Sequence, residues 1–182
     1  MIHYFINKFP FLIIFYCGLL WADTVTQGQI YEYFLKGEHA LLQKNYPQAE
    51  INLSKALSLA PDSPTILQSL VDLKSFQGEY SDAIKYLKRI RELSPENKER
   101  GLELFQLYIQ KENLDDAREL MDTLLVFYPG DIELLYARAN SHYSEQDWPN
   151  LLKTYHSIYL SDTDNINILI RIYEIGSSTG HQ

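Results

Sequence analysis

The stretch EYSDAIKYLKRIRELSP, at residues 79–95, decides the fold because its pattern returns along the chain at a fixed interval. It reads NYPQAEINLSKALSLAP at residues 45–61 and NLDDARELMDTLLVFYP at residues 113–129, each shifted by 34 residues. A fourth copy, DWPNLLKTYHSIYLSDT at residues 147–163, has Leu151 in place of the alanine and Thr163 in place of the closing proline. Many positions that share one period indicate repeated structural units.

Each copy has the apolar pattern of an amphipathic helix, with large or small apolar residues at three- and four-residue steps. The stripe of the first copy consists of Ala49, Leu53, Ala56 and Leu57, and that of the second of Ala83, Leu87 and Ile90. The small alanines suit a close helix crossing, and the prolines that follow end the helix. One unit cannot bury its stripe alone, so the units are predicted to stack on one another.

This order of turn, aromatic, small residue, large apolar residue and proline resembles the second half of the tetratricopeptide repeat (TPR) motif. The resemblance places four units, over about three quarters of the chain, at residues 30–63, 64–97, 98–131 and 132–165. It implies an all-α fold, a right-handed superhelical solenoid of antiparallel helix pairs. Residues 166–182 would then form the terminal helix of an incomplete fifth repeat and a tail, and the apolar character of that helix predicts burial on more than one side.

The N-terminus has the features of an export signal. Residues 9–22, FPFLIIFYCGLLWA, form an apolar run of 14 residues behind Lys8. That run is too short to cross about 30 Å of hydrocarbon but matches the apolar core of a secretory signal. We therefore assign residues 1–22 to a signal peptide and residues 23–29 to a short linker. An uncleaved membrane anchor and a buried helix are the alternatives.

Charge and composition exclude several classes of partner. The net charge is −8, and no Lys/Arg cluster offers the basic face that nucleic acid or an anionic membrane surface requires. The single cysteine, Cys17, lies in the predicted leader, so a processed chain has no thiolate for catalysis or metal binding.

Sequence motifs of catalysis are absent. The chain has no Gly-rich phosphate loop, no H-E-x-x-H and no G-x-S-x-G. His142 and His156 fall on different helices without a third ligand, which favours packed or surface histidines over a metal site. Asn52-Leu53-Ser54 matches a glycosylation acceptor but lies within a predicted helix. We expect a protein that is not an enzyme and that needs no cofactor and no metal.

The TPR resemblance implies a concave groove, lined by the first helix of each unit, that binds another protein or a peptide segment. The residues expected to face this groove are Tyr31, Phe34, Gln68, Asp72, Leu102, Gln106, Tyr136, Asn140 and Tyr143. On the fourth unit, Tyr136, Asn140 and Tyr143 share one helical face, where two rings could hold apolar side chains and the amide a ligand backbone group. Alternatively, Tyr143 packs against the neighbouring helix.

The family's carboxylate clamp holds the terminal carboxylate of a ligand with basic residues. At its basic positions this chain has Phe34, Gln68, Leu102 and Tyr136, none of which is basic. The resemblance therefore does not imply a receptor for chaperone tails.

Three functional hypotheses follow. The leading one is an exported scaffold or adaptor, periplasmic or anchored facing the periplasm, with a role in envelope assembly or secretion. A second is a substrate-recruiting or accessory region of a larger enzyme or polysaccharide-export machine, of which this chain is a fragment. The third is self-assembly, driven by the apolar terminal helix. Fold alone does not choose among them.

If the leader is a cleaved signal, the exported form should begin near Asp23. Intact mass and N-terminal sequencing of that form measure this directly. A protein that keeps residues 1–22 and resists carbonate extraction would show a membrane anchor instead.

Overall fold

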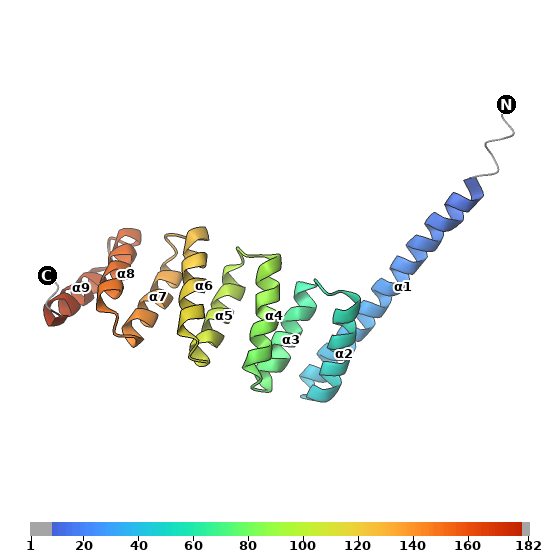
Figure 1. The fold of residues 1–182 in the computed structure, drawn as a ribbon, viewed down its shortest axis with the longest axis horizontal. Coiled ribbons are helices and arrows are strands. Elements are labelled where there is room, and N and C mark those ends of the chain that lie inside the picture. The colour runs from blue at the N-terminus through green and yellow to red at the C-terminus, as the bar shows by residue number, and fades with distance from the viewer. Residues whose placement is uncertain (1–8, 180–182) are drawn as a thin grey trace, which may run out of the picture. The chain divides into compact units, whose positions relative to one another are not determined.

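The computed structural model of the chain describes residues 9–179, with the side chains of residues 26–178. Within these ranges the chain forms helices joined by short turns and contains no strand, which confirms the all-α prediction for this part of the molecule. The chain divides into two compact units, with the division between Leu93 and Ser94. Figure 1 shows the helices in chain order, from blue α1 to red α9.

The first unit consists of two helix pairs. α1 (Phe9–Leu42) packs against α2 (Tyr46–Leu59), and α3 (Pro64–Phe76) packs against α4 (Tyr80–Leu93). The buried face of α2 also contacts α3, so the two pairs share one core.

The second unit contains two further pairs and one additional helix. α5 (Lys98–Gln110) packs against α6 (Leu114–Phe127), and α7 (Ile132–Ser144) packs against α8 (Trp148–Ser161). The last helix, α9 (Ile166–Thr179), lies against α8. The first helices α5, α7 and α9 begin at intervals of 34 residues, as the sequence period requires.

The region of the predicted leader is described only in part. Residues 1–8 lie outside the described residues, as does the end of the predicted tail, 180–182. The predicted linker, residues 23–29, is helical and belongs to α1. It is polar but lacks proline, and each residue added to an existing helix gains a backbone hydrogen bond. Of the helices in the described residues, none has the length and apolar character needed to cross a membrane.

The connection inside every helix pair has the same backbone geometry. One residue of each takes the left-handed conformation, with φ between 56° and 74°, and these residues are Lys44, Gly78, Glu112 and Gln146. The next residue then donates a backbone hydrogen bond back across the turn, as Glu79 N does to Lys74 O at 2.8 Å. This is the hydrogen bond that closes a Schellman-type helix end. The turn thus reverses the chain within three residues.

The starts of the helices are capped by side chains that the sequence places there. Ser63 accepts a hydrogen bond from Ile66 N at the start of α3, where Pro64 occupies the first turn. Asn97 and Asp131 do the same for α5 and α7. Such caps satisfy backbone donors that have no partner in the first turn.

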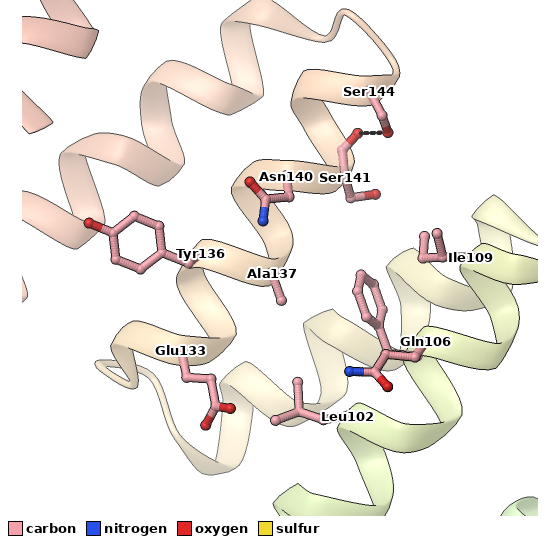
Figure 2. Close-up of a pocket in the computed structure, with 10 residues that line it drawn as sticks. Leu102, Gln106, Ile109, Glu133, Tyr136, Ala137, Asn140, Ser141 and Ser144 are labelled. Atoms are coloured by element: carbon pink, nitrogen blue, oxygen red, sulfur yellow. Dashed lines mark hydrogen bonds between the residues drawn. The ribbon is translucent and has the colours of Figure 1, made fainter.

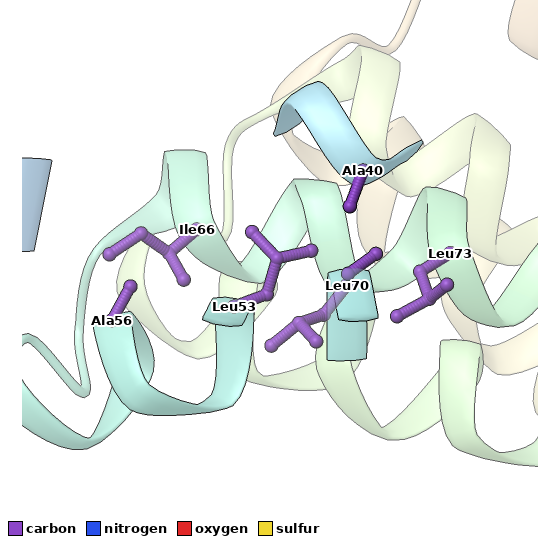
Figure 3. Close-up of a cluster of buried hydrophobic side chains, with 7 residues drawn as sticks. Ala40, Leu53, Ala56, Ile66, Leu70 and Leu73 are labelled. Carbon is purple, nitrogen blue, oxygen red and sulfur yellow. The ribbon is translucent and has the colours of Figure 1, made fainter. Parts of the chain in front are cut away.

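The predicted stripes of the second helices are buried in all four pairs. Three positions of the 34-residue period are at most 5% exposed in each pair, and the residues are Ala49, Leu53 and Ala56; Ala83, Leu87 and Ile90; Ala117, Met121 and Leu124; and Leu151, Tyr155 and Ile158. Figure 3 shows the corresponding cluster of the first unit, where Leu53 and Ala56 meet Ile66, Leu70 and Leu73 of α3. Leu57, also assigned to the stripe, is only partly buried against this cluster.

The terminal helix α9 buries one side only. Ile168 is 1% exposed, whereas Ile166, Leu169, Ile170 and Tyr173 are between 43% and 77% exposed. The described chain therefore covers one face of this apolar helix and leaves the opposite face in contact with solvent.

Gly37 marks a close approach of the paired helices α1 and α2. A Cβ atom added at Gly37 would lie 2.6 Å from Cγ and Cδ2 of Leu53, which is itself fully buried. Gly28, on the same helix α1, has no atom within 4 Å of the corresponding position. Alanine substitutions at the two positions therefore distinguish the clash with Leu53 from the effect of alanine on helix stability.

Gly37→Ala should lower the free energy of unfolding by about 1–2 kcal/mol, because Leu53 has no space into which to move. Gly28→Ala should leave it unchanged or raise it by up to about 1 kcal/mol, since alanine favours the helix. Urea unfolding followed by circular dichroism measures both. Equal effects of the two substitutions would show that the helices do not cross at Gly37.

Candidate functional site

The second unit contains a pocket between the first helices of two consecutive pairs, α5 and α7. It has a volume of about 600 Å³. Its lining residues, shown in Figure 2, are Leu102, Phe105, Gln106, Ile109, Glu133, Tyr136, Ala137, Asn140, Ser141 and Ser144. One wall of the pocket is formed by α5 and the other by α7. The lining residues of each wall are mostly three or four apart, and such residues share one face of a helix.

Four of the residues predicted for the groove meet in this pocket. Leu102 and Gln106 come from α5, and Tyr136 and Asn140 come from α7. The Gln106 and Asn140 side chains are exposed and make no hydrogen bond within the described part of the chain. Tyr136 is partly buried, and its hydroxyl accepts a hydrogen bond from Asn165 Nδ2 at 3.3 Å. The pocket thus combines apolar surface with two amides that are available to a ligand.

Tyr143, also predicted to line the groove, does not line this pocket. Its ring is 59% exposed and meets Trp148 edge-on, with 5.8 Å between the ring centroids. It therefore contacts the neighbouring helix α8, as the alternative interpretation of this residue proposed. The α7 wall instead follows Glu133, Ala137, Asn140 and Ser144.

Several lining residues were not among the predicted groove residues. Ala137 and Ser144 follow from Asn140 by helical spacing alone, but their small side chains carry no chemical signal of a binding site. Phe105 is the equivalent, in the third repeat, of Gly37 in the first, where the first helix approaches its partner. It is 8% exposed. Its ring fills that position and contributes to the pocket lining. Ala137 and Ser144 could have been predicted from their position on the same helical face as Asn140, without regard to side-chain type.

The first unit places the other predicted residues in two different situations. Tyr31 and Phe34 line a smaller pocket of about 320 Å³, together with Ile30 and residues at the start of α3. Gln68 and Asp72 line neither this pocket nor the one in the second unit. Gln68 Nε2 instead donates a hydrogen bond to Asp72 Oδ1 at 3.0 Å.

A third hollow, about 650 Å³ in volume, follows the outer face of α6 and is lined by that helix alone. Arg118 on this face already pairs with Asp115 and with Glu145, so its charge is engaged within the protein. The α5–α7 pocket offers two converging walls, and we regard it as the candidate site.

Charge at the α5–α7 pocket is negative and confined to one end. Of the described residues that line the pocket, only Glu133 has a formal charge. Its carboxylate receives a hydrogen bond from Lys98 Nζ at 2.9 Å, and Asp131 receives a second at 2.9 Å. These bonds to Glu133 and Asp131 raise the pKa of Lys98 well above its usual range, so it stays charged. One lysine shared by two carboxylates leaves a net negative charge beside the pocket.

Neither a metal nor a glycan site emerges from the described residues. No group of three or more His, Cys, Asp or Glu side chains among them could hold a metal ion. Asn52, the candidate glycosylation acceptor, is 5% exposed and donates a hydrogen bond to Gln48 O at 2.8 Å. Its amide is thus held inside the helix pair.

Comparison with known proteins agrees with this geometry. Residues 76–140 match the tetratricopeptide repeat family. This part of the chain carries the tetratricopeptide repeat pattern. A comparison with curated protein sequences gave no match.

Solved structures of TPR proteins share the fold of this chain. MamA from Desulfovibrio magneticus RS-1 is 11% identical with a TM-score of 0.61, over 84% of this chain and 86% of that one. Another MamA structure is 16% identical with a TM-score of 0.64, over 84% of both chains. YrrB, described as a TPR protein with an unusual peptide-binding site, is 13% identical with a TM-score of 0.59, over 82% of this chain and 77% of that one. At these identities the likeness establishes the TPR fold and no more.

One position of the 34-residue period, on the first helix of each pair, is buried in every repeat although its residue type varies from apolar to charged. The residues there are Ala40, Lys74, Tyr108 and His142, all at most 6% exposed. Lys74 Nζ is hydrogen-bonded to Glu50 Oε1 at 2.7 Å and to Glu79 Oε2 at 2.8 Å, so the buried charge is paired twice.

His142 has no such partners. Its Nδ1 lies 3.4 Å from Asp147 Oδ2, but neither ring nitrogen makes a hydrogen bond within the described residues. Burial lowers the pKa of His142 below its ordinary 6.5; Asp147 and Glu145 oppose that shift, whereas Arg138 and Arg118 add to it. The imidazole is therefore held neutral behind the α7 wall of the pocket, in keeping with the packed histidine that the sequence suggested.

The stability of the second unit should fall on acidification because of His142. Below about pH 6.5 the unfolded chain binds a proton at this residue that the folded chain resists, so stability is lost by at most about 1.4 kcal/mol per pH unit. His142→Tyr, which copies Tyr108 at the same position, should remove this part of the pH dependence. Urea unfolding at several pH values measures it.

The matched control is His156→Tyr, since His156 is an exposed residue of α8. The loss of stability on acidification should be smaller in His142→Tyr than in this exposed control. Identical pH profiles for the wild type and His142→Tyr would show that the buried histidine is not held neutral.

Proposed function

We propose that this protein is a non-catalytic TPR scaffold that binds a segment of another protein in the α5–α7 pocket. The observation that carries the proposal is the convergence of Leu102, Gln106, Tyr136 and Asn140 on one pocket with two amides that have no partner within the described chain. Apolar surface with a few placed polar groups is the usual composition of a ligand pocket. TPR proteins bind peptides or proteins as a class, which supports the same function here.

We further propose that the protein acts outside the cytoplasm, in the periplasm or anchored facing it, in envelope assembly or secretion. The support is the sequence of residues 1–22, with its apolar run behind a single lysine. Self-association through α9 remains a prediction, supported by the exposed Ile166, Leu169, Ile170 and Tyr173.

A photoreactive amino acid at Ser144, at the end of the α7 wall, should crosslink the partner in an envelope extract. The same probe at His156, on the exposed face of α8, should not yield that product. Identification of the crosslinked peptide by mass spectrometry supplies the partner for quantitative binding.

Tyr136→Ala combined with Asn140→Ala should then weaken binding of this partner about thirtyfold, from the loss of about 2 kcal/mol at one anchor. Tyr143→Ala, which lies outside the pocket, should change binding by less than about threefold, within the ordinary range for peripheral contacts. Calorimetry measures both, and circular dichroism confirms that helicity is retained. Undiminished binding by the double variant would place the site elsewhere.

A further inference from the structure

The α5–α7 pocket has features that select one class of polypeptide ligand, if the proposed function holds. Three properties matter: the charge of its lining, the amides on its walls and its length along the helices. Each restricts the ligand independently of the others.

The charge excludes ligands recognised through an anionic group. Among the described residues, no Lys, Arg or His side chain lines the pocket, and the one charged lining residue is Glu133, whose side chain is 64% exposed. The nearby Lys98 is already shared by Asp131 and Glu133. A terminal carboxylate, a phosphate or an acidic side chain would therefore meet a like charge and no available cation, while a basic residue would be attracted.

The amides favour a ligand with an extended backbone. Gln106 on α5 and Asn140 on α7 face the pocket from opposite walls, as Figure 2 shows. Each side-chain amide can donate and accept hydrogen bonds. An extended segment presents unpaired backbone N–H and C=O groups to such amides, whereas a helical ligand has already paired its own.

The dimensions agree with a short extended segment. The α7 wall runs from Glu133 to Ser144, which is about 16 Å at 1.5 Å per residue. An extended chain covers that distance with about five residues at 3.3 Å each. Leu102, Phe105 and Ala137 contribute apolar lining that can receive one apolar side chain of the segment.

From these observations we infer that the pocket binds an extended segment of about five residues, away from the partner's C-terminus, that carries one bulky apolar side chain flanked by neutral or basic residues. The segment needs no free C-terminal carboxylate, because the described lining offers no cation to hold one. Its backbone pairs with Gln106 and Asn140, and its flanking basic residue lies near Glu133.

The test uses a phage library of random linear peptides, displayed without a free C-terminus and selected on the immobilised protein. The recovered sequences should share one bulky apolar residue without acidic neighbours. A synthetic peptide of the recovered sequence should bind equally well as a C-terminal acid and as a C-terminal amide. Gln106→Ala with Asn140→Ala should weaken it about tenfold through two lost hydrogen bonds. Gln110→Ala, an exposed amide of α5 outside the pocket, should leave binding unchanged.

Charge is tested by placing an aspartate beside the apolar residue of the peptide. This change should weaken binding roughly threefold at low salt, and Glu133→Gln should restore it. Nuclear magnetic resonance of the bound peptide should show extended chemical shifts. Pocket-dependent peptides that are acidic, need a free carboxylate or bind as helices would overturn the inference alone. Peptides that bind the wild type and the double variant equally, or failure to recover any peptide, would overturn the proposed function as well.

Discussion

Each helix pair depends on a three-residue turn that contains one residue in the left-handed conformation. Only glycine adopts this conformation without steric cost, and Gly78 alone of the four positions is glycine. Lys44, Glu112 and Gln146 adopt it under the constraint of helices packed on both sides. Because the turn is this short, the second helix of a pair must return along one face of the first. The opposite face of the first helix is then free for other contacts.

That division of faces explains where the candidate site lies. On α5 and α7 one face is buried by the apolar stripes of α6 and α8, through Ala117 and Leu151 among others. The other faces of α5 and α7 converge on the pocket, with Gln106 and Asn140 as its free amides. Packing within a helix pair thus requires small or large apolar residues only on the faces that the two helices bury against each other. The residues that line the groove are not under this requirement and can vary. Binding specificity can change there with little effect on the fold.

Buried polar side chains show how much the same position can vary. The register position of Ala40 holds Lys74 in the next repeat, where two carboxylates pair with the amine. In the fourth repeat it holds His142, which has no hydrogen-bond partner among the described residues and a pKa lowered by burial. A buried charge must be paired, whereas an imidazole can lose its proton and remain buried as a neutral group. The same buried position therefore holds Lys74 as a cation paired with carboxylates and His142 as a neutral imidazole.

The sequence by itself determined the repeat period, the helix starts and the buried stripes, because these follow from local spacing, proline positions and the need to bury one face of each helix. It also indicated the groove face, and Leu102, Gln106, Tyr136 and Asn140 meet as that face requires. Only the tertiary structure decided which of these side chains share a pocket. Tyr143 turns to Trp148, Gln68 pairs with Asp72, and Phe105 contributes to the pocket from a position expected for helix pairing. The physical reason is that register fixes the face on which a residue lies, whereas its contacts depend on the size of side chains from helices remote in the sequence.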